Sequence, residues 1–200
     1  MIDKKTLDRY ETNAAYYADL YDNQYPQNLY DLIKTYFKKG EPSADIGCGS
    51  GRDAHFLREC GYPVTGYDAS RAMILEAEKR YPGIPYRYAV LPELNEIPDT
   101  SYVNILCSAV LMHLPSDKLE DACDNLLRIT VPGGIIIISV RSSREKLSRE
   151  SDGRLYNRIS GGALVRYYEQ TGAALLYRDE LHDETRDDVR WMTFVFERND

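Results

Sequence analysis

The residues best suited to chemistry are glycines and carboxylates gathered around a single turn. The segment Asp45-Ile46-Gly47-Cys48-Gly49-Ser50-Gly51 ends a predicted strand and precedes a helical pattern that begins near Arg52. Because glycine has no Cβ, the backbone can turn sharply here and a bulky nucleoside can lie against the loop. The free amides at the start of the following helix, Arg52-Asp53, can bind an anion or a carboxylate.

A second carboxylate, Asp68, follows Gly51 by 17 residues, at the end of the next predicted strand. A carboxylate in that place can accept hydrogen bonds from both hydroxyls of a ribose. The glycine spacing is G-x-G-x-G, and Arg52 stands where a dinucleotide fingerprint counted from Gly47 needs its third glycine. The spacing therefore disfavours a nicotinamide oxidoreductase. A tight strand-to-helix turn that binds no ligand is the structural alternative.

The composition is that of one globular domain. The chain has 200 residues, of which 43% are hydrophobic and 28% charged, which is enough for one core but thin for two. The net charge of -7 disfavours non-specific nucleic-acid binding, which depends on basic residues that neutralise phosphates. Four scattered cysteines without a C-x-x-C pair indicate reduced thiols and no metal site. Without a secretory or bilayer-spanning apolar stretch, we expect a cytoplasmic protein that does not bind membranes.

Helical and strand-like hydrophobic periods alternate from about residue 28 onward, which is typical of an α/β fold. Upstream of this region, one helix is predicted over 3–22 and a second over 28–39, with Gly40 ending it. Seven strands are expected, and the last two should make one edge of a mostly parallel sheet antiparallel. The predicted strands are 43–47, 63–68, 85–90, 102–108, 134–140, 173–178 and 190–197, and the later helices are 52–60, 70–80, 116–130 with Ser116 as N-cap, and 161–171.

Four stretches of the chain resemble the class I S-adenosylmethionine-dependent methyltransferases in their order and spacing. They are ADIGCGSGRDA, VTGYDASRAMI, ILCSAVLMHLP and VPGGIIIISV. The resemblance implies a doubly wound, seven-stranded, Rossmann-like sheet in a single domain over residues 1–200. Within it we expect an N-terminal helical cap (1–39), a cofactor-binding core (40–140), and an acceptor-site cover with closing strands (141–200). The GSGRDA variant is also similar to the tellurite-resistance and thiopurine-type branches, which act on small nucleophiles.

The resemblance also implies the cofactor, S-adenosyl-L-methionine, with S-adenosyl-L-homocysteine as the product. Asp68 would hold the ribose, and Ala69 would lie beside the adenine. The residues that would surround the methionine part are Asp45, Gly47, Gly49 and Gly51.

Adenine recognition departs from the family pattern. Many members carry an acidic residue after the third strand, whereas this chain has Ala89 and Val90 there. The amide of Val90 or Leu91 is the expected contact instead. Arg52, together with Cys107 and Ser108 at the carboxyl end of the fourth strand, completes the predicted cofactor site, because ligands bind at that edge of such sheets.

Methyl transfer from a sulfonium is an in-line displacement, so the protein mainly aligns the reactants and excludes water. His113, also delivered to the carboxyl edge, could act as a general base. A hydrogen-bonded structural histidine is the alternative. Tyr17 and Tyr21, on one face of the first helix, could pack over the cofactor, because aromatic faces attract a cationic sulfonium. This predicts that the helix is a lid, and simple core packing is the competing interpretation.

Residues 141–166 contain seven basic and three acidic side chains, a local net charge of +4. This segment is predicted to cover the acceptor pocket and to select an anionic acceptor, unless it is a solvated charged loop. Arg154 lies within SDGRLY, which resembles a D-G-R element of bacterial methyltransferases, and joins Tyr21 and His113 as a predicted acceptor contact. We expect a small-molecule acceptor, with a protein or RNA methyltransferase, or a non-catalytic S-adenosylmethionine-binding module, as alternatives.

Overall fold

The computed structural model describes residues 2–143, 149–182 and 189–200. Its seven strands form one sheet in the order β3-β2-β1-β4-β5-β7-β6. β1 to β5 are parallel, whereas β7 runs antiparallel to both β5 and β6, which confirms the predicted antiparallel edge. The strands are β1 (Ser43–Ile46), β2 (Val64–Asp68), β3 (Tyr86–Tyr88), β4 (Tyr102–Ser108), β5 (Thr130–Ser143), β6 (Ala173–His182) and β7 (Val189–Arg198). Most of the charged segment predicted between the last two strands, residues 183–188, lies outside the described residues.

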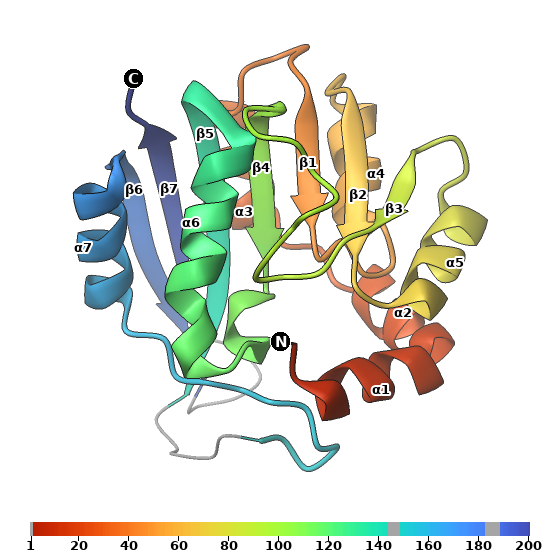
Figure 1. Cartoon of the computed structure of the whole chain (residues 1–200). Helices are drawn as coiled ribbons and strands as arrows, with labels where there is room; N and C mark the ends of the chain where they lie inside the picture. Colours follow the sequence, from red (N-terminus) through yellow and green to blue (C-terminus); the bar gives the residue numbers. More distant parts are fainter. Residues whose placement is uncertain (1, 144–148, 183–188) are drawn as a thin grey trace.

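Helices cover both faces of the sheet (Figure 1). α3 (Gln27–Tyr36), α4 (Arg52–Glu59) and α5 (Arg71–Arg80) contribute to the core on one face, and α6 (Leu119–Ile129) and α7 (Gly161–Thr171) to the core on the other. The isoleucines of β5 alternate between the two cores, Ile135 and Ile137 in the first and Ile136 and Ile138 in the second. This two-sided burial explains why the strand reads as a continuous apolar run.

The N-terminal segment forms two helices, and the prediction of one helix over 3–22 is wrong. α1 (Lys4–Thr12) and α2 (Ala14–Asp22) meet at Asn13, whose φ of -126° breaks the helical path. The Asn13 side chain donates a hydrogen bond to the Arg9 carbonyl, a local bond of the kind that competes with helix continuation. The bend brings the rings of Tyr10 and Tyr17 together at a centroid distance of 4.9 Å. Both helices lie below the carboxyl ends of the parallel strands in Figure 1.

Two further helix boundaries differ from prediction. α3 ends at Tyr36, short of residue 39, because Phe37 adopts extended dihedrals and packs into the core beneath the sheet. Ser116 is not the N-cap of the next helix. It starts a short 3-10 turn, η2 (Ser116–Lys118), and α6 begins only at Leu119, without a side-chain cap.

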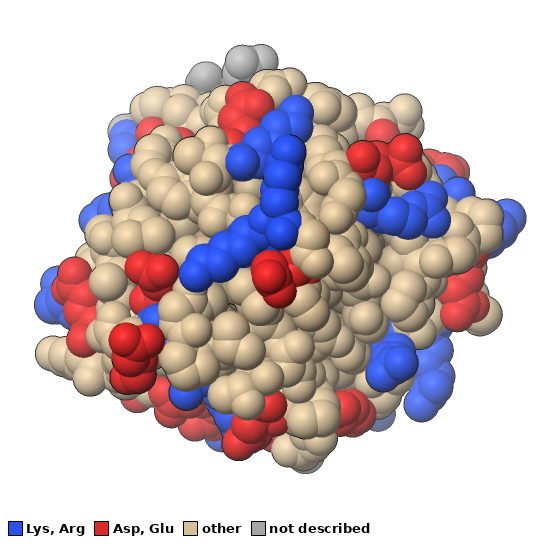
Figure 2. Space-filling model, turned by 90° about the horizontal axis from the view of Figure 1, so that it is seen from above, with Lys and Arg blue, Asp and Glu red and all other residues tan. Residues whose placement is uncertain are grey.

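The face at the amino ends of the parallel strands is seen from above in Figure 2. Figure 2 shows a strip of basic side chains next to acidic ones, further acidic and basic groups toward the rim, and uncharged surface between them. Within the described residues, no helix combines the length and the apolarity needed to cross a bilayer. All four cysteines are free thiols. The residues predicted to do chemistry gather at the opposite edge.

Candidate cofactor and acceptor site

A cavity of about 890 Å³ lies at the carboxyl ends of the strands and is roofed in part by α1 and α2. Its lining combines the turn after β1, the ends of β2, β4, β5 and β7, and the segment after β5. The predicted site residues that line it are Gly47, Gly49, Arg52, Asp68, Ala69, Leu91, Ser108, Tyr21, His113 and Arg154. Those that lie outside its lining are Tyr17, Asp45, Gly51, Val90 and Cys107.

Asp68 is held at the end of β2 by two backbone amides. The Gly49 amide donates to its Oδ2 at 2.9 Å, and the Ser70 amide donates to its Oδ1 at 2.8 Å. Burial raises the pKa of Asp68, and these amide bonds oppose that shift. A carboxylate has about four lone-pair positions, so both oxygens can still accept from a pair of vicinal hydroxyls. The geometry therefore leaves Asp68 able to accept hydrogen bonds from a ribose, and its predicted role in holding the cofactor stays a prediction.

The glycines of the turn meet different needs. Gly47 has a φ of +74°, and a Cβ there would lie 2.4 Å from Cγ2 of Val110, so close packing against the turn after β4 demands glycine. Gly49 has a φ of +53°, and a Cβ there would meet nothing closer than the Met73 methyl at 3.7 Å. The open side of Gly49 faces the cavity, where a ligand can approach the backbone.

Asp45 lies beneath the turn. It is 2% exposed, and its Oδ2 has no hydrogen-bond partner among the described residues. Burial raises the pKa of Asp45 well above its ordinary range, and the neighbouring Asp53 carboxylate raises it further. The Ala54 amide hydrogen-bonds the side chain and opposes this effect. Asp45 is thus buried next to the turn and outside the cavity lining, and its predicted contact with the cofactor stays a prediction.

Arg52 joins the start of α4 to the end of α2. Its guanidinium donates to both carboxylate oxygens of Asp53, at 2.8 and 3.0 Å, and to the Tyr21 carbonyl at 3.0 Å. These bonds make Arg52 an anchor for the cap, and cofactor contact by the same side chain stays a prediction. Cys107 is fully buried in the core, whereas the next residue, Ser108, reaches the cavity and hydrogen-bonds Ser139 at 2.9 Å between the Oγ atoms.

His113 ends the short 3-10 turn η1 (Leu111–His113) and faces the cavity. Its Nδ1 lies 2.7 Å from the Leu155 carbonyl oxygen, which can only accept, so Nδ1 carries the proton. In the neutral ring Nε2 then accepts from the Tyr10 hydroxyl at 3.3 Å. Burial lowers the pKa of His113 to about 4, and the nearby Arg154 cation contributes to the shift. This environment favours the structural interpretation, while a role as general base stays a prediction.

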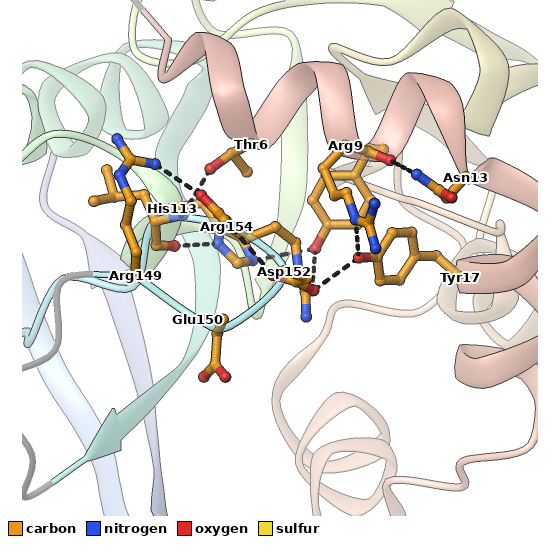
Figure 3. Close-up of polar contacts among 12 residues, drawn as sticks. Thr6, Arg9, Asn13, Tyr17, His113, Arg149, Glu150, Asp152 and Arg154 are labelled. Atoms are coloured by element: carbon orange, nitrogen blue, oxygen red, sulfur yellow. Dashed lines mark hydrogen bonds and ion pairs between the residues drawn. The ribbon is translucent and has the colours of Figure 1, made fainter.

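Arg154 occupies the centre of a polar network between the cap and the segment after β5 (Figure 3). Its Nε donates to Asp152 Oδ2 at 2.7 Å, and its Nη1 donates to the hydroxyls of Tyr10 and Tyr21 at 3.0 and 3.1 Å. Its guanidinium also lies over the Tyr17 ring, 4.7 Å from the centroid. This network already engages the guanidinium of Arg154. Contact between Arg154 and an acceptor stays a prediction.

The same segment is tied to the cap at two further points. Tyr17 donates to Asp152 Oδ2 at 2.8 Å, so this tyrosine holds the cap closed from outside the cavity lining. Arg149 pairs with both oxygens of Asp3 at 3.0 and 2.7 Å, and this pairing lowers the pKa of Asp3 well below its ordinary range. The contact between Tyr17 and Asp152 is drawn as a dashed line in Figure 3.

The structure adds a sheet wall that the sequence analysis missed. β5 pairs with β7 so that Ser139 lies opposite Thr193 and Arg141 opposite Trp191, and all four line the cavity. In the sequence, Arg141 is one of the seven basic residues of 141–166 and directly follows the predicted strand 134–140. That position is a signal for the carboxyl edge, but the strand register that builds the wall cannot be read from sequence. Residues 144–148, part of the predicted acceptor cover, lie outside the described residues.

The fold and site define a class of protein. A doubly wound sheet with an antiparallel edge carries a glycine turn after β1 and a carboxylate at the end of β2, and both border one cavity at the carboxyl edge. Residues 44–138 match the family described as a methyltransferase domain. The family match, together with the methyltransferase relatives and structural neighbours described next, supports assignment to the class I S-adenosylmethionine-dependent methyltransferases.

Relatives and solved structures point to the same class. The chain is 31% identical over 120 residues to trans-aconitate 2-methyltransferase of Methylobacterium nodulans, covering 58% of this chain and 43% of that protein. It is 28% identical over 151 residues to malonyl-[acyl-carrier protein] O-methyltransferase of Serratia marcescens, covering 74% and 57%. The chain thus spans about half the length of these curated relatives. Its fold is similar, with a TM-score of 0.79, 15% identity and coverage of 98% and 88%, to a Burkholderia thailandensis 1,6-didemethyltoxoflavin-N1-methyltransferase with bound S-adenosylhomocysteine.

Proposed function

We propose that this protein is an enzyme that transfers a methyl group from S-adenosylmethionine to a small-molecule acceptor in the cytoplasm. The observation that carries the proposal is the Asp68 carboxylate, fixed by the Gly49 and Ser70 amides at the wall of the cavity. The match of residues 44–138 to the methyltransferase domain family and the size of the cavity support it.

The residues present fit the cofactor. Asp68 has lone pairs for two ribose hydroxyls, Ala69 and Leu91 offer surface for the adenine, and the open side of Gly49 leaves room for the methionine part. When bound, the cofactor supplies an electrophilic methyl group on a sulfonium. The chain itself contributes alignment, and its cap keeps water from the reacting groups.

A small acceptor is favoured over a protein or an RNA by the closure of the cap. Hydrogen bonds of Asp3, Tyr17 and Arg154 hold α1 and α2 against the segment after β5, where the two helices cover part of the cavity. The names of two relatives, trans-aconitate 2-methyltransferase and malonyl-[acyl-carrier protein] O-methyltransferase, support an acceptor of the carboxylic acid type.

Calorimetric titration with S-adenosylhomocysteine tests the cofactor site. Replacing Asp68 with Asn removes the charge that accepts the ribose hydroxyls, and we expect the dissociation constant to rise about 10- to 100-fold, since hydrogen bonds to charged groups are worth about 1.5–3 kcal/mol. Asp99→Asn is the matched control, because Asp99 pairs with Arg128 outside the cavity lining. Absence of binding heat from the wild type would refute the proposal. Binding without turnover of a labelled methyl group would instead identify a non-catalytic module.

A further inference from the structure

The cavity extends beyond the cofactor residues along the antiparallel part of the sheet. Ser108, Ser139 and Thr193 place hydroxyls on neighbouring strands there. Arg141 and Trp191 lie two residues further along β5 and β7, as the next cross-strand pair on the same face of the sheet. These residues belong to β4, β5 and β7, whereas Asp68 ends β2 on the other side of β1 in the sheet. This wall is therefore the part of the cavity available to an acceptor.

Three arginines approach this end, and each is paired with an acidic side chain. Arg149 pairs with Asp3, Arg154 with Asp152, and Arg141 Nη1 with Glu150 Oε1 at 2.7 Å. The guanidinium of Arg154 is also bonded to two tyrosine hydroxyls, and Arg149 donates to the Gly153 carbonyl. Among these three guanidinium groups, the strongest candidate for a further partner is therefore Arg141.

Arg141 has an unused donor inside the molecule. Its side chain is 12% exposed, and its Nε is buried without a hydrogen-bond partner among the described residues. The guanidinium carbon lies over the Tyr156 ring, 4.6 Å from the centroid, and this contact helps to hold the side chain in place. A buried N–H without a partner destabilises the free protein, so the site favours a ligand that accepts a hydrogen bond from it. A planar guanidinium matches a carboxylate best, because it can donate two parallel hydrogen bonds.

We propose that the methyl acceptor is a small organic acid and that Arg141 binds the carboxylate that receives the methyl group. This inference rests on the proposed function and names its substrate class. Glu150 keeps the arginine in place in the free protein and limits its attraction for anions. The hydroxyls of Ser139 and Thr193 on the same wall can donate to the remaining carboxylate lone pairs.

The chemistry is consistent with the side chains present. A carboxylate oxygen forms the new bond to the methyl carbon, the carbon–sulfur bond breaks with its electron pair on sulfur, and a neutral methyl ester and a neutral thioether result. No proton is transferred, so no general base is required. The lowered pKa of His113 and the engagement of its Nε2 by Tyr10 agree with such a reaction. Because the carboxylate loses its charge as the bond forms, Arg141 serves mainly to bind and orient the acceptor and should affect KM more than kcat.

The test supplies labelled S-adenosylmethionine and a panel of mono- and dicarboxylic acids, each beside its neutral primary amide, together with phenols, amines and thiols. We expect transfer to carboxylic acids and not to their amides, with a product that releases labelled methanol in alkali, as methyl esters do. Calorimetric titration of the same acids in the presence of S-adenosylhomocysteine gives a second readout that does not depend on turnover.

Two variants with opposite expected signs separate recognition from a merely structural role. Arg141→Gln should raise KM for the acid about 10- to 100-fold with a smaller change in kcat, in line with loss of a charge-assisted pair. Glu150→Gln should lower KM about three- to tenfold, because the competing negative charge is gone. Arg190→Gln is the matched control, since Arg190 also pairs with a glutamate, Glu180, at 2.7 Å but lies outside the cavity lining. Each variant must retain wild-type affinity for S-adenosylhomocysteine, which shows that the fold is intact.

The outcomes are distinct. Transfer only to phenols, amines or thiols, no binding or turnover of any acid in the panel, or equal KM values for the Arg141 and Arg190 variants would each overturn the inference while leaving a methyltransferase in place. Failure of S-adenosylhomocysteine itself to bind would overturn the proposed function, and the inference would fall with it.

Discussion

Protonation of His113 should destabilise the fold in mildly acidic solution. The pKa of its imidazole is lowered by burial to about 4 from an ordinary value of 6.5. Between these two values the unfolded chain binds a proton that the folded chain does not, so the free energy of unfolding decreases as the pH falls through this window. Linkage gives a loss of about 2 kcal/mol between about pH 8 and about pH 5, and of about 3 kcal/mol once both states are protonated.

Urea unfolding of the wild type and of His113→Asn at these two pH values measures the effect. The Asn amide can replace the Nδ1–H donor to the Leu155 carbonyl but does not titrate, so the variant should lose about 2 kcal/mol less than the wild type between about pH 8 and about pH 5. His55→Asn is the control, because His55 lies on α4 with its side chain 36% exposed. The reasoning is refuted if the two variants show the same pH dependence, or if NMR titration of His113 gives a midpoint near its ordinary value.

Three further predictions concern the turn and the cap. Gly47→Ala should reduce the free energy of unfolding by about 3 kcal/mol, because its Cβ meets Val110, whereas Gly61→Ala, at a similar φ but in open space, should cost only about 1 kcal/mol in the same urea assay. Tyr17→Phe removes the hydrogen bond to Asp152 and should lower the free energy of unfolding by about 1–2 kcal/mol. Tyr16→Phe is the control and should leave it nearly unchanged, because Tyr16 is exposed; equal effects of the two substitutions on the unfolding midpoint would contradict a stabilising bond from Tyr17 to Asp152. Asp3→Asn retains an N-cap but loses the ion pair with Arg149, and we expect a loss of about 1 kcal/mol at low ionic strength that shrinks at high ionic strength, as thermal unfolding at both can verify.

The sequence predicted an element well where the hydrophobic period and the end signals both lie within that element. The strand at Tyr102–Ser108 and the helix at Gly161–Thr171 have the predicted bounds, since each combines an unbroken hydrophobic period with clear end signals. The predicted helix over 3–22 failed because its apolar spacing continues across Asn13, while a single side-chain bond to the Arg9 carbonyl interrupts the backbone. Hydrophobic periodicity records which side chains face inward and does not record such local competition.

The sequence by itself indicated the methyltransferase class, the seven strands in their order along the chain, and a glycine turn followed by Asp68 at the end of the next strand. These features depend on glycines, a carboxylate and apolar runs at short spacing, which remain legible along the chain. Only the tertiary structure decided what surrounds them. In the structure, Arg154 donates hydrogen bonds to Tyr10 and Tyr21. Tyr17 lies outside the cavity lining, and Arg141 lies opposite Trp191 on the wall formed by β5 and β7. These contacts join residues more than 40 positions apart in the chain, and they depend on strand register and on how the helices pack. Neither property produces a local pattern in the sequence, so the contacts could not be predicted from it.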